Sequence, residues 1–198
     1  MKTVACMSLG LVIIVMSPSM NAQGQGLLNV AFRPSMSVPL KDLGTTNLKN
    51  GGGFEATFSY QFTQGFTVYG GWGWNTFLPE EDPAPFDHFE ETGYRFGVQR
   101  IQPLSKNSKL NFLISGGAVL NHIETENDEG EIIDDSGHGI GWEADIGISI
   151  PLNEKWQIVP GVRYHALSRE IVTDGIAESV DLNYIAIGVS VSWTLAQF

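Results

Sequence analysis

The sequence predicts an all-β fold: a transmembrane, antiparallel, up-and-down β-barrel of eight strands. Beyond residue 22, apolar and polar residues alternate with a period of two along most of the chain. The alternating stretches run about ten residues, which suits tilted strands that cross a membrane. The connections between them alternate between short and long, as in barrels whose two rims face different compartments.

The N-terminal segment has the order of a secretory signal peptide. Residues 4–16 are apolar but too short to span a bilayer as a helix. The helix-breaking, small and polar residues Ser17-Pro18-Ser19 follow, and then Met20-Asn21-Ala22. Cleavage is expected after Ala22, so the mature chain would begin at Gln23. The alternative is a short N-terminal anchor helix. We therefore divide the chain into a signal peptide, residues 1–22, and one barrel domain, residues 23–198.

Composition excludes several classes of protein. Cys6 is the only cysteine and lies in the signal, so the mature chain is expected to lack disulfides and cysteine-based metal sites. Charged residues make up 17% of the chain, below the typical quarter, and 22 Asp and Glu outnumber 11 Lys and Arg. This acidic balance argues against nucleic acid as a partner.

The first four predicted strands lie in the N-terminal half. Residues 28–38 carry Leu, Val, Phe and Met at even positions, with Asn, Ala, Arg and Ser between them. Residues 54–62 set Phe, Ala and Tyr against Glu, Thr, Ser and Gln. Residues 66–75 set Phe, Val and Trp against Thr, Tyr, Gly and Asn, and residues 93–99 set Tyr, Phe and Val against Gly, Arg and Gln. Each segment therefore has one apolar and one polar face.

The last four predicted strands repeat the pattern. Residues 110–121 alternate less cleanly, with Leu, Phe and Ile against Asn, Ser and Gly. Residues 140–150 set Ile, Trp and Ala against Gly, Glu, Asp and Ser. Residues 156–165 set Trp, Ile, Val and Tyr against Gln, Gly, Arg and His, and residues 185–195 set Ile, Val, Trp and Leu against Ala, Gly, Ser and Thr. The period of two again indicates strands.

The composition of the two faces decides which one meets lipid. The polar faces hold mostly Gly, Ser, Thr, Asn and Gln, with no Lys at their centres, whereas an exterior in water would be rich in Lys and Glu. The apolar face is therefore assigned to lipid and the small polar face to a narrow interior. The alternative is a soluble, lipocalin-like barrel that is apolar inside. Pro34 and Pro160 would each remove a ladder hydrogen bond, so β-bulges are expected there.

The connections and the aromatic residues set the orientation. Residues 63–65, 102–108 and 151–155 form short connections, and the long ones are residues 38–51, 79–91, 122–137 and 168–178. Short turns and both termini are then periplasmic, and the long loops extracellular. Aromatic side chains toward the strand ends would form interfacial girdles; they are Tyr60, Trp72, Trp74, Trp142, Trp156 and Trp193.

With its signal, its eight alternating segments and its C-terminal Thr194-Leu195-Ala196-Gln197-Phe198, the mature chain resembles small outer-membrane β-barrel proteins, the broad class of OmpX, OmpW and the OmpA membrane domain. The resemblance implies the outer membrane of a Gram-negative cell, with its lipid and lipopolysaccharide as surroundings. It also implies that Phe198 is read by the barrel-assembly machinery. Trp193 and Leu195 have the opposite parity to Phe198, and a bulge near Ala196 would reconcile them.

Two loops are strongly acidic. Residues 79–91 and residues 122–137 contain no Lys or Arg, and their acids are Glu80, Glu81, Asp82, Asp87, Glu90, Glu91, Glu124, Glu126, Asp128, Glu129, Glu131, Asp134 and Asp135. The spacing is not that of an EF-hand, so no dedicated metal site is predicted. A solvated acidic surface is the simpler interpretation. Weak divalent cation binding that bridges these loops to lipid phosphates stays open.

A possible enzymatic site combines His165, Ser168 and Glu178 near the top of the barrel. It resembles that of the lipid A deacylase PagL, also an eight-stranded barrel, whose family places His and Ser two residues apart and then Asn. Here the spacing is three residues and Arg169 follows. His165 also has inward parity, whereas a lipid-cleaving site must open to the bilayer. No catalytic residue and no cofactor is therefore predicted.

Charged residues of inward parity form the main candidate site: Arg33, Glu55, Arg95, Glu143, Asp145, Arg163 and His165. Ionised side chains in a narrow barrel are costly unless they pair. If the hairpin of residues 140–165 centres on Glu154, Asp145 faces Arg163 and Glu143 faces His165. The set is interpreted as a salt-bridged plug, and a gate or ion path is the alternative.

The sequence therefore predicts a plugged outer-membrane barrel with a structural or surface-interaction role. A narrow pore or carrier for small molecules, as in OmpW-like proteins, is the second hypothesis. A lipid A deacylase is the third.

Overall fold

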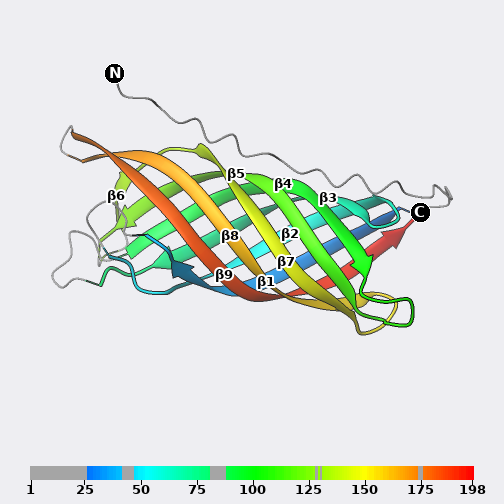
Figure 1. The fold of residues 1–198 in the computed structure, drawn as a ribbon. Coiled ribbons are helices and arrows are strands. Elements are labelled where there is room, and N and C mark those ends of the chain that lie inside the picture. Colours follow the sequence, from blue (N-terminus) through cyan, green and yellow to red (C-terminus); the bar gives the residue numbers. More distant parts are fainter. Residues whose placement is uncertain (1–25, 42–46, 81–87, 128, 130, 174–175) are drawn as a thin grey trace, which may run out of the picture.

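A computed structural model describes residues 26–41, 47–80, 88–127, 129, 131–173 and 176–198 (Figure 1). The predicted signal peptide and the expected start at Gln23 lie outside these residues. Within the described residues no helix is long and apolar enough to cross a membrane.

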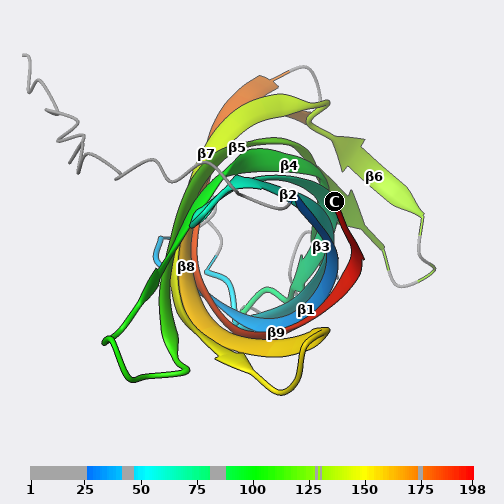
Figure 2. The same cartoon turned by 90° about the vertical axis from the view of Figure 1, so that its right-hand side faces the viewer.

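The described chain forms nine antiparallel strands. They are β1 (Leu27–Pro39), β2 (Gly51–Thr63), β3 (Phe66–Phe77), β4 (His88–Pro103), β5 (Asn111–Glu126), β6 (Ile132–Asp135), β7 (Gly139–Pro151), β8 (Trp156–Thr173) and β9 (Ile176–Gln197). Their order is β4-β3-β2-β1-β9-β8-β7-β5-β6, and an additional β4–β5 pairing closes the ring. Figure 2 looks along the axis of the closed barrel, with β6 bent away from it. Eight strands make the barrel, as the sequence predicts, and closure leaves no sheet edge facing hydrocarbon.

Strand β6 is an outward extension of the β5–β7 hairpin. Asn121 pairs with Gly139, but Glu124 pairs with Asp135, so three residues on one strand oppose two on the other. Gly137 occupies this kink with a φ of 62°, a left-handed conformation that glycine adopts readily. Residues 122–137 and 168–178, expected as loops, are therefore largely paired strand; β8 and β9 pair as far as Thr173 and Ile176. Above the lipid belt the outward positions are polar, as at Glu124 and Asp181, so the apolar outward face that marks the strands of the belt is missing there.

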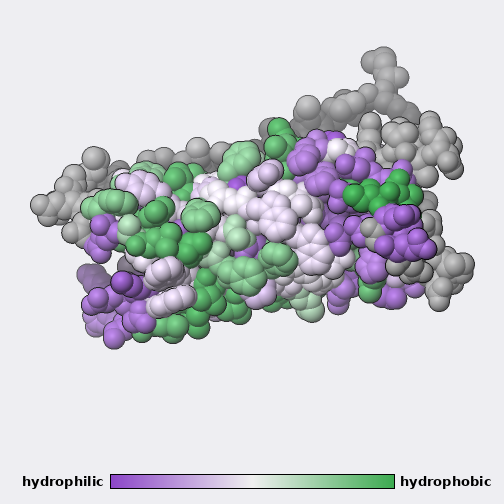
Figure 3. Space-filling view, turned by 180° about the vertical axis from the view of Figure 1, so that it is seen from behind, coloured by the Kyte–Doolittle hydropathy of each residue, from purple (hydrophilic) through white to green (hydrophobic). Residues whose placement is uncertain are grey.

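The side-chain faces follow the predicted parity. The outward face of the middle of the barrel exposes large apolar residues, among them Phe58, Tyr94, Phe96, Val98, Trp142, Ile146 and Ile187. In Figure 3 hydrophilic residues gather toward both ends, with hydrophobic and near-neutral residues between them. An exposed apolar belt of this extent requires a nonpolar solvent, because soluble monomers rarely expose large contiguous apolar patches.

The two prolines do not produce the expected bulges. The registers of β1–β2 at Pro34 and of β8–β9 at Pro160 run through without a shift. Pro34 instead lies where the pairing of β1 with β9 is interrupted, and Pro160 lies where the pairing of β8 with β7 is interrupted. The reason is that a proline nitrogen carries no hydrogen to donate. The expected bulge near Ala196 is present: β9 shifts register between Ala196 and Thr194, which leaves Leu195 as the extra residue.

Candidate functional site

Six of the predicted inward charges meet at mid-height of the barrel in one ion-paired chain, which we call the charge cluster: Arg33, Glu55, Arg95, Glu143, Asp145 and Arg163. Each of these side chains is buried. The two sets of charges are equal, with three guanidinium groups and three carboxylates, so no formal charge remains uncompensated.

Asp145 and Glu55 each contact two arginines of the charge cluster. One oxygen of Asp145 lies 2.5 Å from Nη1 of Arg33 and 2.8 Å from Nη2 of Arg163. Glu55 contacts both Arg163 and Arg95. The links from β1 to β7 and from β2 to β8 join strands that are not neighbours, so they cross the bore.

Glu143 lies at the end of the series of ion pairs that is opposite to Arg33. It contacts Arg95 and accepts a hydrogen bond of 2.8 Å from the hydroxyl of Tyr69 on β3. Gly97 and Gly117 leave the space that Tyr69 occupies, since a Cβ on either would lie within 2.7 Å of the Tyr69 hydroxyl. Tyr69 is a site residue that the sequence reasoning missed, although its parity is inward.

The predicted β7–β8 register is confirmed: Asp145 pairs with Arg163, and Glu143 pairs with His165. The first pair makes the expected salt bridge. The expected contact between Glu143 and His165 is wrong as an ion pair, because the imidazole Nε2 lies 2.8 Å from Glu91 instead. Glu91 belongs to a predicted acidic loop, residues 79–91, but β4 begins at His88 and carries it inward.

Glu91 and His165 belong to a second, polar layer toward the long-hairpin end. The Glu91 carboxylate accepts hydrogen bonds from the side-chain amide of Asn121 at 2.5 Å and from the hydroxyl of Tyr184 at 2.8 Å. The ring of Tyr184 stacks on that of His165, with 4.6 Å between centroids. Only about 10 Å³ of free space, roughly one water molecule, remains between this layer and the charge cluster.

A third layer is apolar. The buried apolar side chains in the long-hairpin half of the bore form one cluster, the apolar plug: Leu48, Phe77, Phe89, Ile123, Leu167, Val180, Leu182, Tyr184 and Ala186. Phe77 packs edge-on against Phe89 at 6.2 Å and against Tyr184 at 5.5 Å. The interior near the long hairpins is thus packed like a protein core, which the sequence reasoning did not anticipate.

The opposite half of the bore is a polar cavity of about 320 Å³. Its floor is the charge cluster, and its walls carry mostly hydroxyl and amide side chains, such as Thr67, Gln99, Ser115 and Ser192. The cavity extends to the short turn at Asn153–Lys155. It ends blindly, because the charge cluster separates it from the layers above.

The residues of the possible enzymatic site are not brought together. His165 is buried inside the barrel, while Ser168 is exposed and donates a hydrogen bond of 2.6 Å to Asp181. A nucleophile and its base must be within hydrogen-bond reach. The side chain of Glu178 lies outside the described residues.

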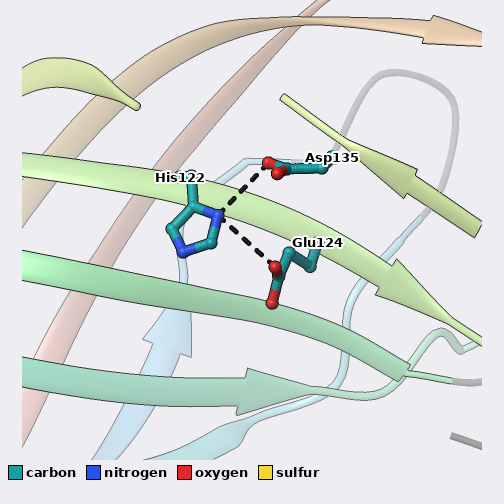
Figure 4. Close-up of side chains that lie close together, drawn as sticks. All are labelled: His122, Glu124 and Asp135. Carbon is teal, nitrogen blue, oxygen red and sulfur yellow. Dashed lines mark hydrogen bonds and ion pairs between the residues drawn. The ribbon is translucent and has the colours of Figure 1, made fainter. Parts of the chain in front are cut away.

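A histidine and two carboxylates meet on the outer wall just above the apolar belt, where β5 meets β6. In Figure 4 one ring nitrogen of His122 points toward the carboxylates of both Glu124 and Asp135. Its Nδ1 lies 3.5 Å from Oε1 of Glu124 and 3.2 Å from Oδ1 of Asp135. Burial, together with the nearby carboxylates of Asp135, Glu126 and Glu90, raises the pKa of Glu124 against the opposing effect of His122. The other predicted acidic loop, residues 79–91, is described only at residues 79–80 and 88–91.

Phe198 lies at the short-turn end, where its backbone nitrogen donates a hydrogen bond of 2.8 Å to the carbonyl of Gly26. Because Leu195 is the bulged residue, Phe198 regains the outward parity of the lipid-facing set, and its side chain is 72% exposed. Its role in assembly stays a prediction.

Comparisons with known proteins place the fold. No protein-family model matches the sequence, and no curated protein is significantly similar to it. Among solved structures, neisserial surface protein A is 12% identical with a TM-score of 0.57, covering 86% of this chain and 97% of that one. Outer membrane protein W of E. coli is 13% identical with a TM-score of 0.53, covering 87% and 100%. OprG of Pseudomonas aeruginosa is 13% identical with a TM-score of 0.50, covering 85% and 95%. The chain therefore has the fold of small eight-stranded outer-membrane barrels, as its sequence predicts.

Proposed function

We propose that this protein is an integral outer-membrane barrel with a closed lumen and a structural or surface-interaction role. The observation that carries the proposal is the filling of the bore by three successive layers: the charge cluster, the polar layer around Glu91 and the apolar plug. A solute would have to break buried ion pairs and then pass the buried apolar plug. Either step is costly in free energy.

The parts of the molecule available for interaction are the hairpins beyond the belt. The β8–β9 hairpin and the β5–β6 extension both lie at the end of the barrel away from the C-terminus (Figure 1). Ile132 and Ile133 on β6 are 55% and 49% exposed, so this extension presents apolar side chains outside the barrel wall. The partners that suit this location are lipopolysaccharide and other outer-membrane lipid, with the barrel-assembly machinery acting on Phe198 during biogenesis.

The polar cavity favours the second hypothesis, a narrow pore or carrier for small molecules. It has room for a small hydrophilic solute, but its floor is the charge cluster. Passage would therefore need Arg33, Arg95 and Arg163 to change partners, whereas entry from the short-turn end needs no rearrangement.

Swelling of proteoliposomes distinguishes a closed barrel from a carrier. Folded protein is reconstituted and challenged with isosmotic glycine or arabinose, with empty liposomes and liposomes containing a general porin as references. The closed barrel should swell no faster than empty liposomes. Swelling that scales with the amount of folded protein would establish the pore or carrier hypothesis in its place.

A further inference from the structure

The cluster of His122, Glu124 and Asp135 has the donor set and the spacing of a transition-metal site. An imidazole nitrogen and two carboxylate oxygens lie within 4.8 Å of one another. Ligands about 2.1 Å from a tetrahedral Zn²⁺ ion lie about 3.4 Å apart. The distances from Nδ1 of His122, 3.5 Å and 3.2 Å, match this spacing. An ion could therefore bind with little movement of the side chains.

The strand register supplies a second, independent reason for a cation. Glu90 pairs with Glu124 across β4 and β5, and Glu124 pairs with Asp135 across β5 and β6. Three carboxylates thus stand abreast on one face, and like charges directly opposite each other destabilise a sheet. In the described part of the chain, no Lys or Arg makes a salt bridge with any of the three. A divalent ion would offset this repulsion.

The site is also held in place by its surroundings. The ring of His138 stacks on that of His122, with 4.5 Å between centroids and 14° between planes, which limits rotation of the ligand ring. Oδ1 of Asp135 accepts a hydrogen bond of 2.8 Å from the backbone nitrogen of Gly137. Hydrogen bonds and packing of this kind orient metal ligands and raise affinity. The left-handed conformation of Gly137 turns the strand so that His138 stacks on His122 and Asp135 accepts its hydrogen bond from Gly137.

We infer that His122, Glu124 and Asp135 form a binding site for a divalent transition-metal ion of the Zn²⁺ class, open to solvent at its remaining coordination position. The imidazole selects against Ca²⁺ and Mg²⁺, which prefer six or more oxygen ligands. Two carboxylates and a neutral imidazole would balance the charge of the ion. The site lies just above the apolar belt, so its open position faces the layer where lipid head groups lie.

Zn²⁺ itself is the probe for the test. Full-length folded protein in detergent is stripped with EDTA and titrated with ZnCl₂ in competition with a chromophoric chelator. His122→Ala and Glu124→Gln are the test variants. Glu131→Gln is the matched control, because it removes an acid from the same hairpin outside the cluster. Heat-dependent migration on SDS gels verifies that every variant is folded.

Wild-type protein and Glu131→Gln should bind one Zn²⁺ per chain, and each test variant should bind at least tenfold more weakly. Millimolar Ca²⁺ should not displace the ion, and Co²⁺ should give the absorption of a site with nitrogen and oxygen ligands. Absence of saturable one-to-one binding would overturn the inference, as would displacement by Ca²⁺. Equal losses in Glu131→Gln and Glu124→Gln would show diffuse attraction to an acidic surface. The Co²⁺ spectrum needs only wild-type protein, so a misfolded variant does not block the test.

Discussion

Arg163 lies at the centre of the charge cluster, and replacing it tests whether the cluster acts as one network. Its guanidinium contacts Glu55 and Asp145. Arg163→Ala leaves Glu55 with Arg95, and Asp145 with Arg33, so neither acid is left without a partner. Asp145→Ala leaves Arg163 with Glu55, but Arg33 then keeps only its hydrogen bond to the carbonyl of Gly161 among the described residues.

The magnitude follows from the burial of these groups. Removing one partner of a buried ion pair costs about 3–5 kcal/mol, because the other charge stays buried. Remaining partners and the adjacent cavity reduce the cost, so we expect each single substitution to lower the free energy of unfolding by about 3 kcal/mol. Coupling between residues in contact is about 0.5–3 kcal/mol. The double variant Arg163→Ala/Asp145→Ala should therefore lose at least about 1 kcal/mol less than the sum of the single losses.

Urea unfolding in detergent micelles, followed by tryptophan fluorescence, measures all four proteins of this cycle. Arg100→Ala provides the matched control, because its guanidinium lies 4.3 Å from the Phe66 ring centroid, away from the cluster. Arg100→Ala combined with Asp145→Ala should be additive within about 0.5 kcal/mol. Strict additivity for Arg163 with Asp145 as well would refute the network.

Three further outcomes follow from the structure. Phe77→Ala, which empties the centre of the apolar plug, should lower the free energy of unfolding by about 3–5 kcal/mol in the same assay, and an effect near zero would mean that the plug is loosely packed. Gly117→Ala should cost about 1–3 kcal/mol, because its Cβ would lie 2.5 Å from the carbonyl oxygen of Phe96 and 2.6 Å from the Tyr69 hydroxyl; Ala118→Gly, at the neighbouring outward position, is the control for local strand stability. Deletion of Phe198 should slow assembly and leave material in the periplasm, measured by cell fractionation, whereas normal surface delivery would show that Phe198 is not an assembly signal.

The strands of the belt could be predicted because lipid imposes a strict rule on each of them. A residue such as Phe96 faces hydrocarbon and Arg95 faces the bore, so one parity must be apolar along the whole crossing. The pairing of Asp145 with Arg163 could be predicted as well, because a tight turn fixes the register of adjacent strands.

The contacts across the bore could not be predicted in this way. Glu55 on β2 contacts Arg163 on β8, and this link depends on the tilt and closure of the barrel rather than on neighbouring registers. Glu91 was missed for another reason: it lies beyond the belt, where the outward residues Glu90 and Thr92 are polar too. Extending the parity of Arg95 and Gly93 by one more step would have placed Glu91 inside.

The His122 site depends on the kink at residues 136–138, which no local pattern signalled. A continuous register from Asn121 and Gly139 would have placed Ser136, not Asp135, opposite Glu124. The one-residue shift turns an acidic loop into a defined group of ligands. The sequence alone therefore supported only a diffuse acidic surface with weak affinity for cations.

Conductance across a planar bilayer tests the closed lumen most directly. Proteoliposomes of known protein content are fused with the bilayer, so that incorporation is verified independently of current, and a general porin serves as the positive control. With the charge cluster and the apolar plug in place, the wild-type barrel should give no unit current steps above the baseline of protein-free bilayers. Reproducible steps of one size, at a frequency that rises with protein content, would show that the lumen is an open path.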